Sequence, residues 1–327
     1  MFDMNEYRLI FKPLGTISKI PDAQTIFGAL CQIMLQTKGE AYFQKYIDSF
    51  QTDQPLLVHS SMFPYPYLPM VTQSLFSIRY IHDHLLQQEA IDQLTYLQTM
   101  KQYKKIRYVS EKVYQKYLQS NQLETLKADL IHHGQLVIQN GCLQFQNEKI
   151  AYRYEQVVNT HVQKTTFHYS RSNPEKVNEL YYEPDDYFDD STQFHVFIRT
   201  ELSTKEIEEL FQYAPYFGFG SRHSVGKNSF RMIQIEQLPS IQSEQQILLS
   251  KCAYDDCFNY DQSHYQIESR LHRTSKFYLN HLATGRFNLL SEGSCMSINR
   301  YKPWYGKLLP IEIQNHKLYY YAIGFVM

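Results

Sequence analysis

Apolar residues along the chain alternate between strand-like runs and helical spacing, which predicts a fold that mixes strands and helices. Residues 7–11 (YRLIF) are typical of a strand, and a loop punctuated by proline and glycine follows them. Asp22 then stands where a helix N-cap is expected, and apolar residues recur at helical spacing from Ile26 to Met34. We therefore predict a strand, a loop and a helix that ends near Gly39.

The middle of the chain carries weaker signals. Residues 104–109 (KKIRYV) predict a short strand, and Ser110 is placed to begin a helix. Asn140-Gly141 separates two apolar runs, which is a strong signal for a two-residue β-hairpin. After Val157 we expect a loop-rich stretch that ends in the acidic residues 183–190 (EPDDYFDD), which we interpret as a solvated loop rather than a metal site.

A second strand–helix–strand unit is predicted further on. Residues 194–199 (FHVFIR) form a clear strand pattern, and Ser203 with Glu206 matches a capping box at the start of a helix. A glycine-rich segment, residues 218–230 (GFGSRHSVGKNSF), separates this second helix from a last strand at 231–235.

This order of elements predicts an α+β fold. We expect two ferredoxin-like (RRM-like) domains, over residues 1–238 with long insertions and over residues 239–327, joined near Leu238-Pro239-Ser240.

Composition narrows the functional classes. The chain has 327 residues, enough for two cores, and a net charge of −1, so any polyanion site must come from local clustering or from backbone amides. Its five cysteines are scattered, as in proteins of a reducing compartment. Acids at Asp3 and Glu6 exclude a signal peptide, and no apolar tract reaches membrane-spanning length. We predict a cytoplasmic protein without membrane contact.

Aromatic content is high, with 28 tyrosines and 20 phenylalanines against one tryptophan. Tyrosine combines an apolar ring with a polar tip, so it suits large interfaces and stacked bases. Ordinary tyrosine-rich cores explain the same composition, and both interpretations stay open.

The glycine-rich segment is the strongest candidate for chemistry. Gly218, Gly220 and Gly226 can adopt positive φ, so successive amides can point into one concavity that holds a phosphate. Residues 210–235 contain no acid. Five residues separate Gly220 from Gly226, which excludes the nucleoside-triphosphate loop, and the helix–loop–strand order excludes the dinucleotide fingerprint. A tight helix-to-strand turn is the alternative.

Several pieces of the chain resemble one family. A loop of the form GFGxxxSxGKxxF before the last strand resembles the RAMP superfamily of CRISPR proteins. Residues 13–30 (PLGTISKIPDAQTIFGAL) are similar to the opening of the fourth subunit of the Csm complex, the type III-A effector. The segments FPYPYLP, YKKIRYVS and YYYAIGF agree with that family in the same order. The chain departs from it at Arg222 and His223, where an aspartate or second glycine is frequent, and matches it loosely over 159–171.

This resemblance implies a non-catalytic subunit that binds the 5′ repeat-derived tag of crRNA. Its implied partners are the crRNA, the large polymerase/cyclase-like Csm subunit and the backbone RAMP subunits, with no cofactor and no metal. The candidate RNA-binding residues are Gly15, Thr16, Ser18, Lys19, Thr25, Gly28, Gly218, Gly220, Ser221, Arg222, His223, Gly226, Lys227 and Arg231. A possible second patch comprises Lys104, Lys105 and Arg107, although lysines that protect a strand edge would look the same.

Two alternatives remain. A metal-independent endoribonuclease that processes crRNA would need a histidine as general base, and His161, His168 and His223 are the candidates. A scaffold that contacts only proteins would need none of the loop cations. Adjacent aspartates such as Asp185-Asp186 point to opposite faces of a strand, so we expect them to be non-catalytic.

Overall fold

The computed structural model describes residues 4–52, 54–72, 98, 101–119, 122, 125–126, 129–130, 134–164, 178–220, 223–239, 245–273, 283–313 and 316–327. The helices in these residues are α1 (Ala23–Lys38), α2 (Glu40–Ser49), α5 (Glu111–Val113), the π-helical turn η2 (Tyr114–Leu118), α7 (Thr204–Phe211), α8 (Ala214–Phe217) and the 3-10 turn η3 (His223–Val225). In the N-terminal two thirds the strands are β1 (Asn5–Pro13), β2 (Leu57–His59), β3 (Phe63–Pro64), β4 (Tyr67–Pro69), β5 (Tyr108–Ser110), β6 (Leu136–Gln139), β7 (Cys142–Phe145), β8 (Tyr154–Lys164), β9 (Asn178–Phe188), β10 (Phe194–Thr200) and β11 (Phe230–Leu238). The C-terminal strands are β12 (Gln245–Ile247), β13 (Phe258–His264), β14 (Ile267–Arg273), β15 (Ala283–Leu290), β16 (Cys295–Ile298), β17 (Tyr305–Ile313) and β18 (His316–Gly324).

The central sheet is antiparallel and has the order β11-β1-β10-β2, with β3 also paired to β10. The two inner strands, β1 and β10, are rich in buried apolar residues: Leu9 pairs with Val196, and Phe11 pairs with Phe194. Helix α1 begins where predicted, because the Asp22 carboxylate accepts a hydrogen bond from the Thr25 amide at 3.1 Å. The α+β class predicted from the sequence is confirmed.

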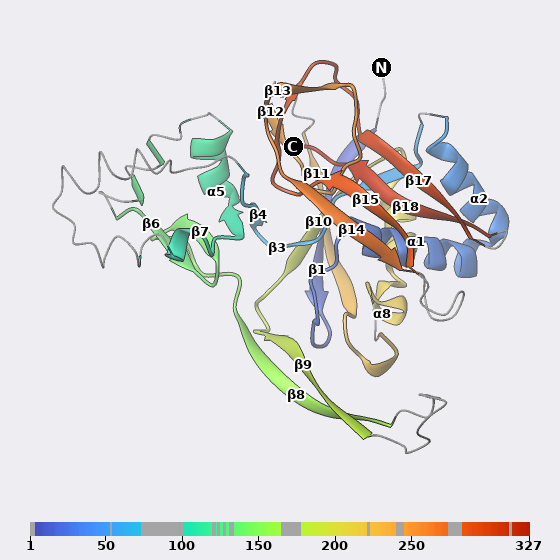
Figure 1. Cartoon of the computed structure of the whole chain (residues 1–327), viewed down its shortest axis with the longest axis horizontal. Coiled ribbons are helices and arrows are strands. Elements are labelled where there is room, and N and C mark those ends of the chain that lie inside the picture. Colours follow the sequence, from blue (N-terminus) through green and yellow to red (C-terminus); the bar gives the residue numbers. More distant parts are fainter. Residues whose placement is uncertain are drawn as a thin grey trace, which may run out of the picture.

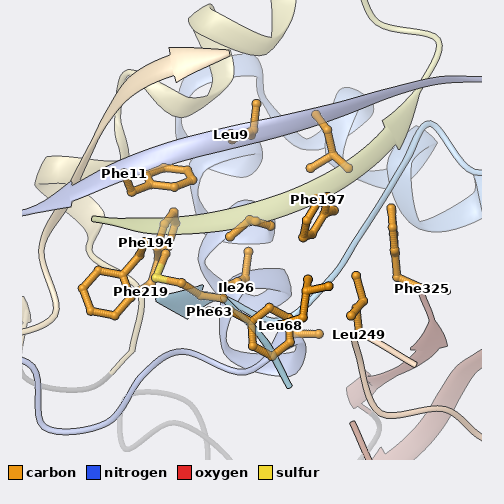
Figure 2. Close-up of a cluster of buried hydrophobic side chains, with 14 of the residues drawn as sticks. Leu9, Phe11, Ile26, Phe63, Leu68, Phe194, Phe197, Phe219, Leu249 and Phe325 are labelled. Carbon is orange, nitrogen blue, oxygen red and sulfur yellow. The ribbon is translucent and has the colours of Figure 1, made fainter. Parts of the chain in front are cut away.

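The hydrophobic core continues across the predicted linker at residues 238–240. Leu9 and Phe197 of the central sheet belong to the same buried cluster as Leu249 and Phe325, and Figure 2 shows these side chains gathered around the sheet. The C-terminal strands form the sheets β12-β16-β13, β14-β15 and β17-β18. The division into two ferredoxin-like domains stays a prediction.

One stretch differs from the prediction. Residues expected to form a loop-rich segment build the hairpin of β8 and β9, paired from Tyr154↔Phe188 to Lys164↔Asn178. Figure 1 shows this hairpin extending away from the body of the protein. The acidic segment is therefore mostly part of strand β9, and the solvated-loop interpretation was wrong. The strands are stabilised by each other across the ladder, which a scan for local turn signals does not detect.

A smaller sheet, β4-β5-β7-β6, lies beside the central one. The predicted hairpin is confirmed, with Asn140 and Gly141 at φ 51° and 75°. The strand predicted from residue 104 begins only at Tyr108, and Lys104 and Lys105 lie in an exposed turn before it. In the described part of the chain, no helix is long and apolar enough to cross a membrane.

Candidate nucleic-acid interface

Two loops far apart in sequence pack against each other and form one surface: residues 14–20 after β1, here called the first loop, and the glycine-rich loop that precedes β11. The Leu14 amide donates to the Ser229 carbonyl at 2.9 Å, and the Asn228 amide donates to the Thr16 carbonyl at 2.9 Å. At Gly15 the backbones approach so closely that a Cβ would lie 2.3 Å from the Gly226 carbonyl oxygen. The folded chain therefore packs residues 14–16 against residues 226–229.

The glycines of the loop have the backbone that the sequence predicted. Gly218, Gly220 and Gly226 have φ values of 63°, 125° and 83°. Phe219 fixes the first part of the loop, because its ring is buried and stacks on Phe230 with centroids 5.6 Å apart. Open space surrounds the Cα of Gly226, which lies on the exposed side. The loop therefore combines a buried anchor with an exposed glycine, Gly226, whose amide donates to the His223 carbonyl at 2.9 Å.

Asn228 is a residue of this site that the sequence analysis missed. Its side chain is buried, its φ is 54°, and its Oδ1 accepts the Ser18 amide at 3.1 Å. Its Nδ2 donates to the Ser18 hydroxyl at 3.0 Å. Asparagine tolerates positive φ better than most residues, so its place after Gly226-Lys227 was the available signal.

The structure gives Lys227 a protein partner. Its ammonium lies 2.8 Å and 2.7 Å from the two carboxylate oxygens of Asp185 in β9. The Asp185 side chain is 2% exposed, and it also accepts a hydrogen bond from Asn159 at 2.9 Å. The side chain predicted to contact RNA therefore holds a buried carboxylate of the hairpin.

The other candidates differ in exposure. Gly15, Lys19, Gly28, His223 and Arg231 are exposed, and Thr16, Ser18 and Thr25 are half-buried. Thr25 approaches the loop, since a Cβ on Gly220 would lie 3.4 Å from its methyl group. Ser221 and Arg222 lie outside the described residues, as does His168.

A cavity of about 380 Å³ adjoins this surface. Lys19 of the first loop and Arg107 of the predicted second patch both line it, so the structure brings part of each patch together. Two further cations line the cavity: Lys251, which follows β12, and Arg270, which lies in β14. Neither was a candidate in the sequence, because both come from the distant C-terminal part of the chain. Lys104 and Lys105 are not among the lining residues.

Carboxylates balance part of this charge. Lys251 lies 3.1 Å from Glu268, 3.9 Å from Glu292 and 4.0 Å from Asp22. Burial raises the pKa of Asp22, but Lys19, the Thr25 hydroxyl and Lys251 outweigh it and hold that pKa below its ordinary value. Asp22 therefore stays ionised at neutral pH. The cavity offers both donors and acceptors, which suits a nucleobase edge as well as a phosphate.

One group among the described residues has the atoms of a metal site: Asp255, Asp256 and Cys257. Two cations already occupy it. Lys302 lies 3.5 Å from Asp255, and the Arg300 guanidinium lies 3.2 Å from the Cys257 sulfur. Asp255 also accepts the amides of Cys257 and Gly306. These contacts indicate a structural turn rather than a ligand set.

Comparisons with known proteins identify solved structures that have a similar fold. No protein-family model and no curated protein sequence matches the chain. A chain of the Csm3-Csm4 subcomplex of the type III-A CRISPR-Cas interference complex is similar in structure, with a TM-score of 0.61 at 15% identity over 98% of both chains. A chain of the Csm1-Csm4 cassette in complex with AMPPNP has a TM-score of 0.52 at 15% identity, over 98% of this chain and 97% of that one. The chain therefore shares its fold with chains of the Csm3-Csm4 and Csm1-Csm4 complexes, which agrees with the resemblance found in the sequence.

Proposed function

We propose that this protein is a non-catalytic, RNA-binding subunit of a type III-A CRISPR-Cas effector complex, which holds the 5′ tag of the crRNA. Residues 1–238 would form its first ferredoxin-like domain, since the order β11-β1-β10-β2 agrees with a β-α-β-β-α-β unit. Residues 239–327 would form the second.

The observation that carries the proposal is the direct contact between the first loop and the glycine-rich loop. The Cβ position of Gly15 lies against the Gly226 carbonyl oxygen and both glycines are exposed, so the paired loops present one surface to the outside. Several amides of the glycine-rich loop, including those of Gly226 and Asn228, already donate to carbonyls of the protein. Exposed cations beside the glycines, such as Lys19, would therefore supply much of the attraction to phosphates.

Lys19 connects this surface to the cavity. It belongs to the first loop and lines the cavity together with Arg107. A single strand that runs over the glycines would meet Lys19 next, and a splayed base would fit the cavity of about 380 Å³. Direct contacts to base edges would then add recognition of sequence to the contacts with phosphates.

The partners follow from assemblies that contain the same fold. The structurally similar chains come from Csm3-Csm4 and Csm1-Csm4 complexes. We infer that this chain likewise contacts a polymerase-like large subunit and a backbone RAMP subunit.

Co-purification tests the proposal as a whole. Affinity-tagged protein, expressed with its neighbouring genes and a repeat array, should bring down crRNA with one defined 5′ end together with other RAMP subunits. Recovery of the protein partners without crRNA would support the scaffold alternative instead. Cleavage of repeat RNA that is lost in His223→Ala would show a nuclease and overturn the non-catalytic assignment.

Salt dependence tests the site. Lys19→Met and Arg107→Met should each weaken binding of a single-stranded tag RNA and make the plot of log K against log salt shallower by about 0.7. Lys205→Met, an exposed lysine of α7, is the matched control and should change neither. Unchanged slopes in the two site variants would exclude these cations from the RNA surface.

A further inference from the structure

We propose that Lys227 is a positioning residue: its ion pair with Asp185 fixes the glycine-rich loop to the base of the β8–β9 hairpin. The role rests on the proposed RNA function, but the coupling of loop and hairpin can be tested without RNA.

The first support is the geometry of the pair. Both Asp185 oxygens lie within 2.8 Å of the Lys227 ammonium, and the side chains are 12% and 2% exposed for the lysine and the aspartate. Asn159, from the opposite strand of the hairpin, donates to the same carboxylate at 2.9 Å. A charge held this closely, away from water, contributes little field to a phosphate outside.

The second support for this role is a group of backbone hydrogen bonds around the ion pair. Asp186, the next residue of β9, exchanges two hydrogen bonds of 3.0 Å with Ile17 of the first loop. Asn228, the next residue of the glycine-rich loop, donates to Thr16 at 2.9 Å. The first loop is therefore hydrogen-bonded to Asp186 and Asn228, the residues that directly follow the two members of the ion pair. Hairpin, first loop and glycine-rich loop meet as three segments in one junction.

This arrangement has a consequence for binding. A loop binds a phosphate well only if its backbone is already held in the binding conformation. Removing one member of a buried pair leaves the other without its counter-charge, and the segments must move to rehydrate it. Loss of either Lys227 or Asp185 should therefore disturb the loop in the same way, although only one of them belongs to it.

The experiment compares Lys227→Met, Asp185→Asn and the double variant Lys227→Met/Asp185→Leu, using single-stranded tag RNA as the probe. Each single variant should weaken binding about tenfold, with an unchanged salt slope. The double variant, in which apolar groups replace the pair, should lose less affinity than the product of the losses in Lys227→Met and in a matched Asp185→Leu variant. Lys19→Met, on the neighbouring loop, should instead change the slope.

A ligand role for Lys227 gives the opposite pattern. Asp185→Asn would then bind as tightly as the wild type or more tightly, and the slope would fall by about 0.7 in Lys227→Met and in the double variant. That result would overturn the proposal. If a single variant fails to fold, the slope of the double variant still separates the two roles.

Amide hydrogen exchange separates this proposal from the RNA function. Asp185→Asn, a change in the hairpin, should speed exchange at the Asn228 and Ile17 amides relative to the wild type, with Lys205→Met as the control. Exchange that stays unchanged at both amides would show that the pair does not hold the junction. If wild-type protein binds no tag RNA, the proposed function fails, and exchange alone decides whether the junction exists.

Discussion

At the scale of single residues, two glycines that look alike in the sequence differ in whether the structure requires a glycine there. Gly15 and Gly28 both lie in the N-terminal segment that resembles the RAMP family, and both were candidate RNA contacts. Gly15 sits against the Gly226 carbonyl, whereas Gly28 lies on the exposed side of α1, where an added Cβ would meet nothing within 4 Å. Only Gly15 is required by the approach of two backbones.

We therefore expect opposite effects of alanine at these positions. Gly15→Ala should lower the free energy of unfolding by about 2 kcal/mol, because the two loops must separate to admit the methyl group. Gly28→Ala should raise it by about 0.5–1 kcal/mol, since alanine is the better residue inside a helix. Urea unfolding of both variants measures the difference, and equal effects would contradict the backbone contact at Gly15.

At the scale of elements, local signals were reliable where the stabilising contacts are local. The capping box at the start of α7 is present as predicted: the Ser203 hydroxyl accepts the Glu206 amide, and the Glu206 carboxylate accepts the Ser203 amide at 2.9 Å. Both partners lie within one helical turn, so four residues of sequence suffice to recognise it. The β8–β9 hairpin is the opposite case, since its first pair, Tyr154↔Phe188, joins residues far apart in the chain.

Ser203→Ala should lower the free energy of unfolding by about 1 kcal/mol, because one amide of the first turn loses its acceptor. Lys205→Ala, in the same turn but outside the box, should change it by no more than about 0.5 kcal/mol. Thermal and urea unfolding of the two variants provide the measurement. A loss in Lys205→Ala as large as that in Ser203→Ala would mean that the cap contributes nothing specific.

At the scale of the whole molecule, Arg199 connects the central sheet to the C-terminal part. Its Nε donates to the buried Glu6 carboxylate at 2.8 Å, and its two terminal nitrogens donate to the carbonyls of Pro303 and Val326 at 2.8 Å and 2.7 Å. Its guanidinium also lies 4.2 Å from the centre of the Phe325 ring. One planar side chain thus satisfies acceptors from both ends of the chain.

Arg199→Met should lower the free energy of unfolding by about 3 kcal/mol or more, because Glu6 remains buried without its counter-charge. Trp304, the single tryptophan, lies next to Pro303 and reports on the C-terminal part by fluorescence, while circular dichroism reports on the whole chain. Both signals should shift together to lower urea concentration. Arg231→Met, on the exposed side of β11, is the control. Two separate transitions in the wild type would show that the halves unfold independently.

The sequence was sufficient for features whose partners lie within a few residues. The cap at Asp22, the turn at Asn140-Gly141 and the capping box at Ser203 all follow from hydrogen bonds and dihedral preferences that a short window contains. The positive φ of the loop glycines belongs to the same group.

Contacts between distant segments needed the folded chain. Lys227 and Asp185 are 42 residues apart, and the lining of the cavity joins Lys19 to Arg107 and Lys251. Charge patterning shows that a lysine is present but not which carboxylate lies beside it, because that depends on strand pairing across the whole molecule. For this reason the sequence predicted a candidate site, while the fold showed that one of its cations, Lys227, is paired with Asp185 of the protein itself.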